Sequence, residues 1–444
     1  MKSKRVSRIE HRESNMKVNL ISLGCPKNLV DSEVILGKLG EVGYALTPSA
    51  EDADIVIINT CSFIDKAIRE SYQVISRIIS QKKSSQKLIV CGCLPQLEGR
   101  KLFFKFPQID VLLGSADFYR IDEVISELGK GRSHLFSVNE PSFIYNSSFP
   151  RFLSTPPSYA YLKIAEGCSN RCSYCLIPQL RGKYRSREPQ DVIKEARILV
   201  DWGVKELILI AQDTTFYGWD LDKKSSLIYL LEQLEKIDKL EWIRLLYTHP
   251  SHFTSSLTRV MANSEKICPY IDLPLQHTHD KILAKMKRPE FQVAEKLIDK
   301  LRSNILGLTL RTTFMVGFPG EGKEHFNKLL KDVERLKFEW LGVFTYSPQK
   351  DTPAYGLAPE VPANIKEKRY QELMQLQQPI TDEFNEKRVG SICSILVDKK
   401  NEGHTQFQTP EIDGKVFFAR EHKPGQYFRE RISLVKNCYD LLVE

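Results

Sequence analysis

The sequence predicts a three-part α/β protein: an open parallel α/β domain, a larger partial (βα)6 barrel, and a small all-β barrel at the carboxyl terminus. Three observations carry this prediction. Short apolar runs alternate with amphipathic stretches over residues 18–131, the alternation returns six times over residues 158–387, and from residue 388 short strands are separated by Gly, Pro and Asp. Strand–helix alternation indicates parallel sheets with covered faces. A chain of 444 residues also exceeds a single hydrophobic core, so several domains are expected.

The first domain is predicted over residues 17–133, after a basic and polar start at residues 1–16 that we expect to be disordered. Its strands are predicted at residues 19–23, 54–58, 87–90 and 111–113, with helices at 32–39 and 64–79. Residues 134–157 are polar, Ser-rich and punctuated by Pro, and this composition is typical of a linker.

The second domain is predicted over residues 158–387. Its six strands are predicted at residues 159–165, 205–211, 242–247, 270–273, 310–316 and 341–346. Six strand–helix units are typical of a partial parallel barrel, in which the chemistry collects at the turns after the strands. A long helix at 363–387 leads into the third domain, residues 388–444. Strands at residues 390–397, 414–419 and 431–436 predict a small barrel of OB-like size there.

Composition narrows the class of protein. The net charge of +8 is modest for this length, and charges of both signs are interspersed, so charge alone does not indicate a nucleic-acid-binding protein. No stretch approaches the roughly 18 apolar residues of a membrane span, and no signal peptide is recognisable. We therefore expect a cytoplasmic protein, in which thiols stay reduced.

Three thiols, Cys168, Cys172 and Cys175, lie within eight positions at the first turn of the predicted barrel. Three thiolates at this C-x3-C-x2-C spacing can reach three corners of an iron–sulfur cube, and one iron would stay open because no fourth ligand stands nearby. A structural zinc normally has four Cys or His ligands, and the next His, His249, is far along the chain. Ten Cys in a chain of this length do not form a disulfide framework.

A second set of thiols follows three strands of the first domain, at Cys25, Cys61 and Cys93. The carboxyl ends of parallel strands share one crevice in an open α/β sheet, so these thiols would converge although they are far apart in the chain. Each thiol alone is more often a packing residue. Three at equivalent turns predict a second cluster. Cys91, inside the third strand, is interpreted as a core residue.

Other unusual residues follow the later barrel strands. Gln212 and Asp213 come after the second strand and Gln276 after the fourth, while the turn after the fifth runs from Gly317 to Glu321. Asp213 could bind the amino group of a ligand, but an Asp that opens a turn is as often a cap. The glycines of the fifth turn permit a ligand such as a ribose to approach the backbone, or form a plain turn.

The run 181–187 carries four basic side chains beside the cluster loop. We interpret it either as a solvated face or as a clamp for an anion or a carboxylate, and the sequence leaves both readings open.

At residues 166–175 the chain resembles the radical S-adenosylmethionine (SAM) enzymes, whose hallmark C-x3-C-x-aromatic-C puts Tyr174 in the aromatic position. From about residue 18 onward it resembles the methylthiotransferases, which combine a domain with three cluster cysteines, a radical SAM barrel and a TRAM domain. The stretch ISLGCPKNLVDSE at 21–33 is similar to the RimO-type branch, which modifies the twelfth protein of the small ribosomal subunit. Residues 162–168, 211–214 and 311–321 agree with this, whereas the tRNA-modifying branch typically reads GCQMN near residue 24.

The resemblance implies two 4Fe-4S clusters and SAM, and it assigns no catalytic side chain. The implied metal ligands are Cys168, Cys172 and Cys175 for one cluster and Cys25, Cys61 and Cys93 for the other. The implied cofactor-binding residues are Tyr174, Gln212, Asp213, Gln276, Gly317 and Glu321. The implied reaction adds a methylthio group to the β-carbon of an aspartate of ribosomal protein twelve. The substrate is either the free protein or the protein within the ribosome. The expected partners are a reductant such as flavodoxin or ferredoxin and a sulfur donor, with no membrane and a monomeric chain.

Two other functions are weighed against this one. A tRNA adenosine methylthiotransferase is disfavoured by the variant Pro26-Lys27-Asn28 and by the nearly neutral third domain, which has nine Lys and Arg against eight Asp and Glu. A non-catalytic iron–sulfur scaffold would have no use for the barrel turns described above. The chain departs from the family at 347–352, where an acidic residue followed by Gly-Thr is common, and at 406–408.

Overall fold

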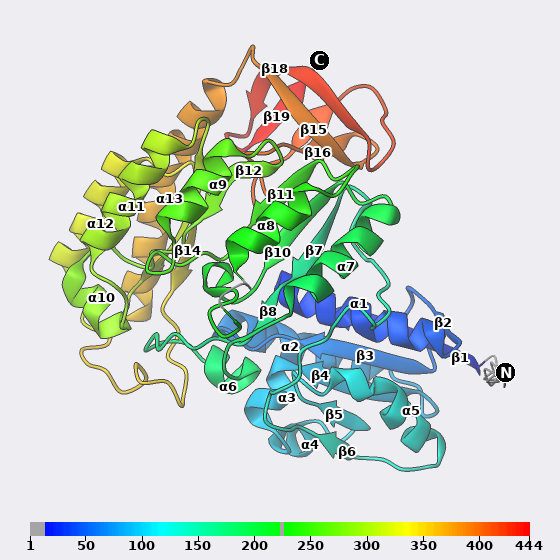
Figure 1. Ribbon diagram of the computed structural model, residues 1–444. Coiled ribbons are helices and arrows are strands. Elements are labelled where there is room, and N and C mark those ends of the chain that lie inside the picture. The colour runs from blue at the N-terminus through cyan, green and yellow to red at the C-terminus, as the bar shows by residue number, and fades with distance from the viewer. Residues whose placement is uncertain (1–13, 223–225) are drawn as a thin grey trace. The chain divides into compact units, whose positions relative to one another are not determined.

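The computed structural model describes residues 14–222 and 226–444. Within them the predicted fold class is confirmed, with two parallel α/β sheets and a closed five-stranded β-barrel (Figure 1). The chain forms two compact units: the first runs to Ser154 and takes in Gln179–Gly182, and the second comprises Thr155–Pro178 and Lys183–Glu444. Of the start predicted to be disordered, residues 1–13 lie outside the described residues, and residues 14–16 belong to strand β1.

A six-stranded parallel sheet in the order β2-β1-β3-β4-β5-β6 forms the centre of the first unit. Its strands are β1 (Ser14–Ser22), β2 (Tyr44–Leu46), β3 (Ile55–Thr60), β4 (Lys87–Gly92), β5 (Val111–Leu113) and β6 (Leu135–Ser137). The four predicted strands correspond to β1, β3, β4 and β5. Strand β6 lies inside the segment predicted as a linker, because its short, half-buried pairing with β5 leaves no clear apolar pattern in the sequence.

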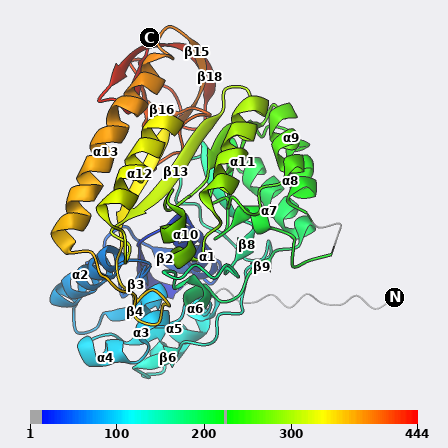
Figure 2. The ribbon, with the colours of Figure 1, turned by 90° about the vertical axis from the view of Figure 1, so that its left-hand side faces the viewer.

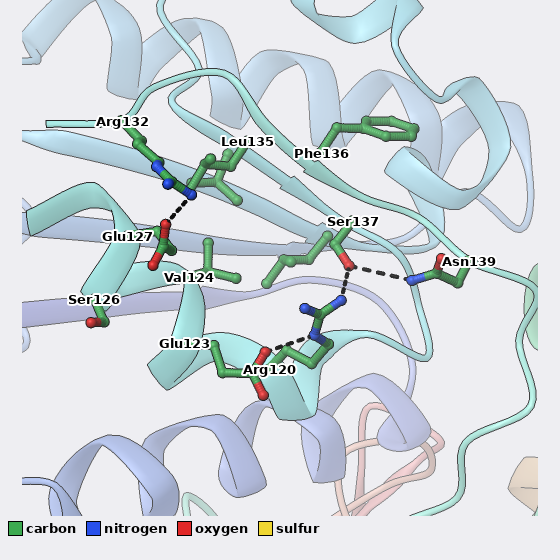
Figure 3. A pocket seen from close by; sticks show the side chains of 12 residues that line it. Arg120, Glu123, Val124, Ser126, Glu127, Arg132, Leu135, Phe136, Ser137 and Asn139 are labelled. Carbon is green, nitrogen blue, oxygen red and sulfur yellow. Dashed lines mark hydrogen bonds and ion pairs between the residues drawn. The ribbon is translucent and has the colours of Figure 1, made fainter. Parts of the chain in front are cut away.

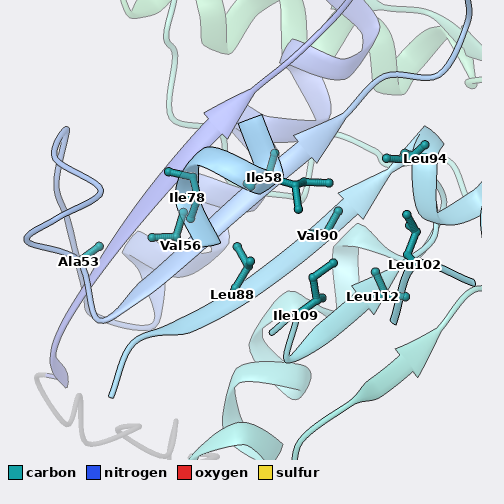
Figure 4. Close-up of a cluster of buried hydrophobic side chains, with 11 residues drawn as sticks. Ala53, Val56, Ile58, Ile78, Leu88, Val90, Leu94, Leu102, Ile109 and Leu112 are labelled. Atoms are coloured by element: carbon teal, nitrogen blue, oxygen red, sulfur yellow. The ribbon is translucent and has the colours of Figure 1, made fainter. Parts of the chain in front are cut away.

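Helices cover this sheet. They are α1 (Pro26–Glu41), α2 (Asp65–Gln81), α3 (Cys93–Glu98), α4 (Lys101–Lys105), η1 (Phe118–Arg120) and α5 (Ile121–Gly129). Figure 4 shows the apolar core on one face, where Val56 and Ile58 of β3 and Leu88 and Val90 of β4 pack with Ile78 of α2. Alternate residues of a strand point to the same face, so both strands contribute to one continuous core. This packing fixes the carboxyl ends of the strands, where the turns with Cys25, Cys61 and Cys93 begin.

The second unit contains an open, six-stranded parallel sheet in the order β14-β13-β12-β11-β10-β7. Its strands are β7 (Tyr159–Lys163), β10 (Glu206–Ile210), β11 (Trp242–Leu245), β12 (Ile267–Asp272), β13 (Thr309–Val316) and β14 (Trp340–Thr345). Each matches a predicted strand within a few residues at either end. The short strands β8 (Ala165–Glu166) and β9 (Arg185–Ser186) pair separately beside the first turn of the barrel.

The helices of the second unit alternate with these strands. They are α6 (Ile177–Arg181), α7 (Pro189–Asp201), η2 (Thr214–Phe216), α8 (Leu227–Glu235), α9 (Ser255–Asn263), α10 (Asp280–Met286), α11 (Phe291–Asn304), α12 (Lys323–Leu336) and α13 (Ala363–Glu386). The long helix α13 packs along α12 and β14 (Figure 2). No helix within the described ranges is both long and apolar enough to cross a membrane.

The terminal β-barrel closes in the order β15-β16-β17-β19-β18. Its strands are β15 (Ile392–Lys399), β16 (Glu402–His404), β17 (Val416–Phe418), β18 (Tyr427–Lys436) and β19 (Asp440–Val443). The three predicted strands correspond to β15, β17 and β18. Strands β16 and β19 have only three and four residues. Strand β17 is as short, but all its residues are apolar, whereas β16 contains Glu and His and β19 begins with Asp.

A buried charge network joins this terminal barrel to β10 and β11. Glu206 accepts a hydrogen bond from Arg244 Nε at 2.6 Å and pairs with His404 Nε2 at 2.5 Å, and all three side chains are at most 1% exposed. Burial disfavours a charged imidazole, but the carboxylates of Asp398 and Glu206 outweigh it and raise the pKa of His404 to about 9. Arg244 also donates to the carbonyl of Gln406 at 2.8 Å. Part of the stretch that departs from the family, 406–408, therefore contacts the parallel barrel.

Candidate metal centres and cofactor site

The first set of three thiols is brought together by the turns after β1, β3 and β4. Cys25 caps α1, which starts with Pro26, and Cys93 opens α3. Gly24 has φ +91°, and a Cβ there would lie 2.5 Å from Cys61 Cβ, so the first two turns approach each other as closely as a glycine allows. Asn28 ties them together by donating to the carbonyls of Leu23 at 2.9 Å and Thr60 at 2.8 Å.

The thiols of this set are close enough to influence one another electrostatically. Burial raises the pKa of Cys61 to about 12, with further increases from Cys93 and Cys25. Burial likewise raises the pKa of Cys93. Neutral thiols are therefore favoured until a metal binds, and assembly of a cluster would release their protons.

Arg181 is the cation of this site. It lies in the segment of residues 179–182 that belongs to the first unit, it is buried, and its Nη1 lies 2.6 Å from Asp31 Oδ2. Its other terminal nitrogen donates to Asn28 Oδ1. The sequence left open whether the run 181–187 is a solvated face or an anion clamp; Arg181 itself is a buried partner of Asp31.

Cys91 and Cys93 have different surroundings. Cys91 is fully buried in β4, and its carbonyl accepts a hydrogen bond from Thr60 Oγ1 at 2.6 Å. Burial raises the pKa of its thiol above the usual range, with Asp31 as the next cause. Cys93 lies beyond the end of the strand, and its Sγ is 3.9 Å from Asn28 Oδ1.

The second set of thiols lies in the loop between β8 and α6. Ser173, in the middle of this loop, donates from its N–H to the carbonyl of Met286 at 3.0 Å and from its hydroxyl to that of Lys285 at 2.7 Å. The loop is thus anchored to the carboxyl-terminal end of α10. Burial raises the pKa of Cys168 to about 11 and that of Cys175 to about 12, with a contribution from Cys172 in both cases.

Among the described residues, no thiol belongs to a group of three ligand atoms close enough to share one metal ion. An iron–sulfur cluster binds its thiolates at separate iron atoms, so the thiols of a set need not meet at one ion. The group that does lie within 4.8 Å consists of Asp213, His249 and His252. Its atoms already bond to neighbours: His252 Nδ1 lies 2.7 Å from Asp213 Oδ2, and His249 Nδ1 accepts the N–H of Ser251 at 3.2 Å.

Gln212 and Asp213 lie at the mouth of the barrel, beside the cluster loop. Gln212 Nε2 donates to Glu166 at 2.5 Å, while its buried Oε1 has no hydrogen-bond partner within the described ranges. Asp213 accepts bonds from Asn170 at 2.9 Å and Thr215 at 2.7 Å besides its contact with His252. A carboxylate offers about four acceptor positions, so one remains for a ligand.

The turns after β12 and β13 hold the other predicted residues. Gln276 has φ +72°, a conformation that non-glycine residues adopt at a cost of about 1–3 kcal/mol and often at functional sites. Gly317 has φ +75°, and a Cβ there would lie 2.3 Å from Lys366 Cγ, so close packing by a protein side chain requires this glycine.

Glu321 stabilises the turn that starts at Gly317. It accepts the N–H of Gly317 at 2.8 Å and a bond from Arg369 at 2.8 Å, and its side chain is fully buried. Burial raises its pKa to about 7. Tyr174 packs edge-on against Phe318 of the same turn, with ring centroids 6.5 Å apart. Glu321 therefore stabilises the turn itself, and Tyr174 packs the cluster loop against that turn.

Arg288 is a candidate that the sequence reading missed. Lys287 follows α10 in the left-handed conformation, with φ +55°. The chain reverses there, and the backbone N–H of Arg288 donates to the carbonyl of Leu283 at 2.9 Å. Burial dominates the raised pKa of Cys175, and the charge of Arg288 opposes it. Within the described residues the guanidinium has no carboxylate partner: its Nη2 donates to the carbonyl of Pro274, and its buried Nε has no hydrogen-bond acceptor. A single Arg after a helix carries no sequence motif that would have identified it.

A cavity of about 660 Å³ opens elsewhere in the first unit, between α5 and strands β5 and β6. Figure 3 shows two ion pairs among the residues that line it, Arg120 with Glu123 and Arg132 with Glu127. None of the cysteines lines this cavity. It is therefore separate from the first thiol set.

Two family models match the chain. The model of the uncharacterised protein family UPF0004 matches residues 17–114, and that of the radical SAM superfamily matches residues 162–333. The structure is similar to that of the radical S-adenosylmethionine methyltransferase TsrM from Kitasatospora setae, which was determined with cobalamin and a 4Fe-4S cluster bound. The TM-score is 0.57 at 15% identity, with 77% of each chain covered. This likeness concerns the fold.

The curated relatives are far more similar in sequence. The ribosomal protein uS12 methylthiotransferase RimO of Heliobacterium modesticaldum is 42% identical, over 97% of this chain and 95% of its own. The proteins with this name from Desulforamulus reducens and a Thermoanaerobacter species are 44% and 46% identical, over 96% and 91% of this chain and 99% and 94% of theirs. The chain therefore belongs to the family of the RimO ribosomal protein uS12 methylthiotransferases, which is built on a radical SAM domain.

Proposed function

We propose that the chain adds a methylthio group to the β-carbon of an aspartate in ribosomal protein uS12. The observation that carries this proposal is the identity of 42–46%, over more than 90% of both chains, to relatives that bear this name. The two separate thiol sets support it, since the reaction needs one site to make a radical and another to present sulfur.

Each of the two units supplies the ligands of one proposed cluster. Cys25, Cys61 and Cys93 would hold one 4Fe-4S cluster, and Cys168, Cys172 and Cys175 the other. Three thiols leave one iron of each cluster open for a further ligand. When bound, the barrel cluster and SAM supply a carbon-centred radical, and the other cluster supplies the sulfur.

The SAM site is proposed around the barrel mouth. Gln212 offers an unpartnered buried oxygen to a donor, and Asp213 retains one acceptor position for an amino group. Arg288 is assigned to the carboxylate of SAM, because it is a cation beside Cys175 without a carboxylate partner of its own in the described part of the chain. Gln276 and Gly317 would line this site from the turns after β12 and β13, while Tyr174 and Glu321 keep the loop and the turn in place.

The remaining assignments are part of the same proposal. Residues 17–133 would form the methylthiotransferase domain, 158–387 the radical SAM barrel and 388–444 the TRAM domain, with 134–157 between the first two. The enzyme would work in the cytoplasm as a monomer, with flavodoxin or ferredoxin as the reductant and a separate sulfur donor.

The test is a reaction with each candidate substrate separately. Anaerobically reconstituted enzyme, SAM, a sulfide source and a reductant are incubated with purified uS12 or with bulk tRNA. The expected result is a mass increase of one methylthio group on an aspartate of uS12, with tRNA nucleosides unchanged. The Cys172→Ala variant is the matched control and should give neither product.

The opposite pattern would contradict the proposal. Methylthioadenosine in the tRNA digest, with uS12 unmodified, would assign the chain to tRNA modification. A nearly neutral terminal domain argues against that outcome, because tRNA binding depends mainly on phosphate neutralisation by Lys and Arg. An enzyme that neither bound nor cleaved SAM would instead be an iron–sulfur scaffold.

A further inference from the structure

Three rings form an aromatic platform at the mouth of the barrel: Phe216, Trp219 and His252. The ring centroids of Phe216 and Trp219 are 4.9 Å apart, those of Phe216 and His252 are also 4.9 Å apart, and those of Trp219 and His252 are 5.2 Å apart. None of these residues is needed to hold a cluster or SAM in the function proposed above.

The exposure of Trp219 is not unusual by itself. Trp219 is 58% exposed and Trp202 is 54% exposed, and single exposed apolar side chains are normal on a protein surface. The two differ in position. Trp202 ends α7 just before β10 begins, whereas Trp219 follows the end of β10, on the side of the barrel where the chemistry collects.

Hydrogen bonds hold the turn that carries Trp219. The backbone N–H of Trp219 donates to the carbonyl of Phe216 at 3.2 Å, and the backbone N–H of Gly218 donates to Ser186 Oγ at 2.9 Å. The carboxylate of Asp220 accepts the N–H and the hydroxyl of Ser186 at 2.8 and 2.6 Å. The Trp219 ring itself packs against Phe216 and His252, and a side chain packed in advance binds a partner at a lower entropic cost.

The platform is also connected to the cluster loop. His252 Nδ1 lies 2.7 Å from Asp213 Oδ2, and the same oxygen accepts a bond from Asn170, between Cys168 and Cys172, at 2.9 Å. A group that rests on the platform is therefore held two hydrogen bonds from the loop that carries the barrel thiols. This is where a protein substrate must be positioned.

We propose that the aromatic platform binds a lysine or arginine side chain of the protein substrate and so positions the neighbouring aspartate at the barrel mouth. This inference rests on the proposed function. Trp provides the best aromatic face for a cation. The exposed carboxylate of Asp220 adds a negative charge beside it. Ribosomal proteins are basic because they bind RNA phosphates, so their side chains suit such a surface.

The test compares Trp219→Ala with Trp202→Ala in steady-state kinetics on uS12. Loss of a cation–π contact should raise KM for uS12 about 5- to 30-fold in Trp219→Ala, with kcat at saturation close to wild type. Trp202→Ala should keep the wild-type KM. Trp219→Phe should restore part of the affinity, because Phe is a weaker aromatic partner for a cation.

A second arm identifies the cation. Each Lys or Arg near the modified aspartate of uS12 is replaced by Gln, and the substrate variants are assayed with both enzymes. For one of them, the effects of the substrate change and of Trp219→Ala should be smaller together than their sum, as expected for groups in contact. Additive effects at every position would overturn the proposal.

Three further outcomes are decisive. Equal changes in KM for Trp219→Ala and Trp202→Ala would show that the platform has no special role. Loss of SAM cleavage in the absence of uS12 would place Trp219 in the cofactor site instead. If wild-type enzyme itself failed to modify uS12, the proposed function would fail, and this result is distinct from an effect of Trp219.

Discussion

The two thiol sets are alike in number, and each contains two thiols whose pKa is raised by burial, but they are built differently. Cys25, Cys61 and Cys93 come from three separate turns of one sheet, so the whole first unit must fold before they meet. Cys168 and Cys175 belong to one loop with Cys172, anchored by Ser173 to α10. The first site therefore depends on the topology of a domain, and the second on a local motif.

The arginines beside the two thiol sets also differ, in whether the protein compensates their charge. Arg181 is buried with Asp31 and Asn28, so its charge is compensated within the protein. Arg288 has no carboxylate partner among the described residues and retains a buried, unpartnered Nε. The charge of Arg181 is thus neutralised by a carboxylate of the protein, whereas that of Arg288 is available to an anionic ligand. We expect the difference to separate sulfur storage from SAM binding.

The largest expected effects separate the two clusters. Cys172→Ala should abolish formation of 5'-deoxyadenosine and of methylthiolated uS12, because the radical is made at the barrel set. Cys61→Ala should still form 5'-deoxyadenosine but give no modified uS12. Liquid chromatography of the nucleoside and mass spectrometry of uS12 measure the two products.

Iron content provides the control for these variants. Reconstituted wild-type protein should carry about eight irons per chain, the total for two cubane clusters. Replacement of all three barrel thiols by Ala should remove roughly half. Loss of all the iron from a folded variant, or zinc in its place, would contradict two independent clusters.

The two arginines should fail in different ways. Arg181→Met breaks the buried ion pair with Asp31, which should reduce the free energy of unfolding by about 3–5 kcal/mol. Arg288→Gln removes a cation that compensates no protein charge, so the loss of stability should be limited to that of its hydrogen bond to the Pro274 carbonyl, about 1 kcal/mol. The affinity for SAM should fall roughly 10- to 100-fold instead, as for a lost hydrogen bond to a charged group.

Thermal unfolding and equilibrium binding of SAM measure both effects. Decarboxylated SAM is the control ligand, because Arg288→Gln should weaken its binding much less than that of SAM. Equal losses for both ligands would indicate that Arg288 only supports the turn after α10.

Alkaline pH should weaken the second unit, which contains His404. The folded-state pKa of about 9 lies above the ordinary 6.5, so the stabilisation is complete below pH 6.5 and is lost as pH rises through 9. Its full size is on the order of 3 kcal/mol. All four Trp belong to the second unit, so thermal unfolding followed by Trp fluorescence reports on that unit.

The matched variant for this measurement is His404→Gln. It should be less stable than wild type at pH 6.5, and the difference should shrink towards pH 9. A difference that stayed constant with pH would mean that His404 contributes by packing and not by its charge.

The smallest expected effect concerns Cys91. Cys91→Ala removes one buried sulfur from β4 and should cost about 1 kcal/mol of stability, with iron content and activity close to wild type. Cys93→Ala should lose the first cluster and the modified product. An inactive Cys91→Ala with an active Cys93→Ala would reverse the assignment of the ligand.

The sequence predicted the fold class and most strands because buried parallel strands are long apolar runs with turns at regular intervals. It also indicated both thiol sets, since spacing and strand ends are local features. It did not indicate β6, the pairing of Arg181 with Asp31, or Arg288, because these depend on contacts between distant segments. The cofactor-binding role predicted for Glu321 stays a prediction, and the structure adds that its side chain contacts Gly317 and Arg369. A motif gives the position of a residue and leaves such contacts open.

The buried network of Glu206, Arg244 and His404 limits how the terminal barrel of this chain can be exchanged. Glu206 and Arg244 pair within the parallel barrel, and Glu206 and His404 pair between the parallel barrel and the terminal barrel. Loss of His404 would leave the buried carboxylate of Glu206 with one cation fewer, which costs stability. A chimaera that exchanged residues 388–444 should therefore be more stable when the new segment places a cation opposite Glu206.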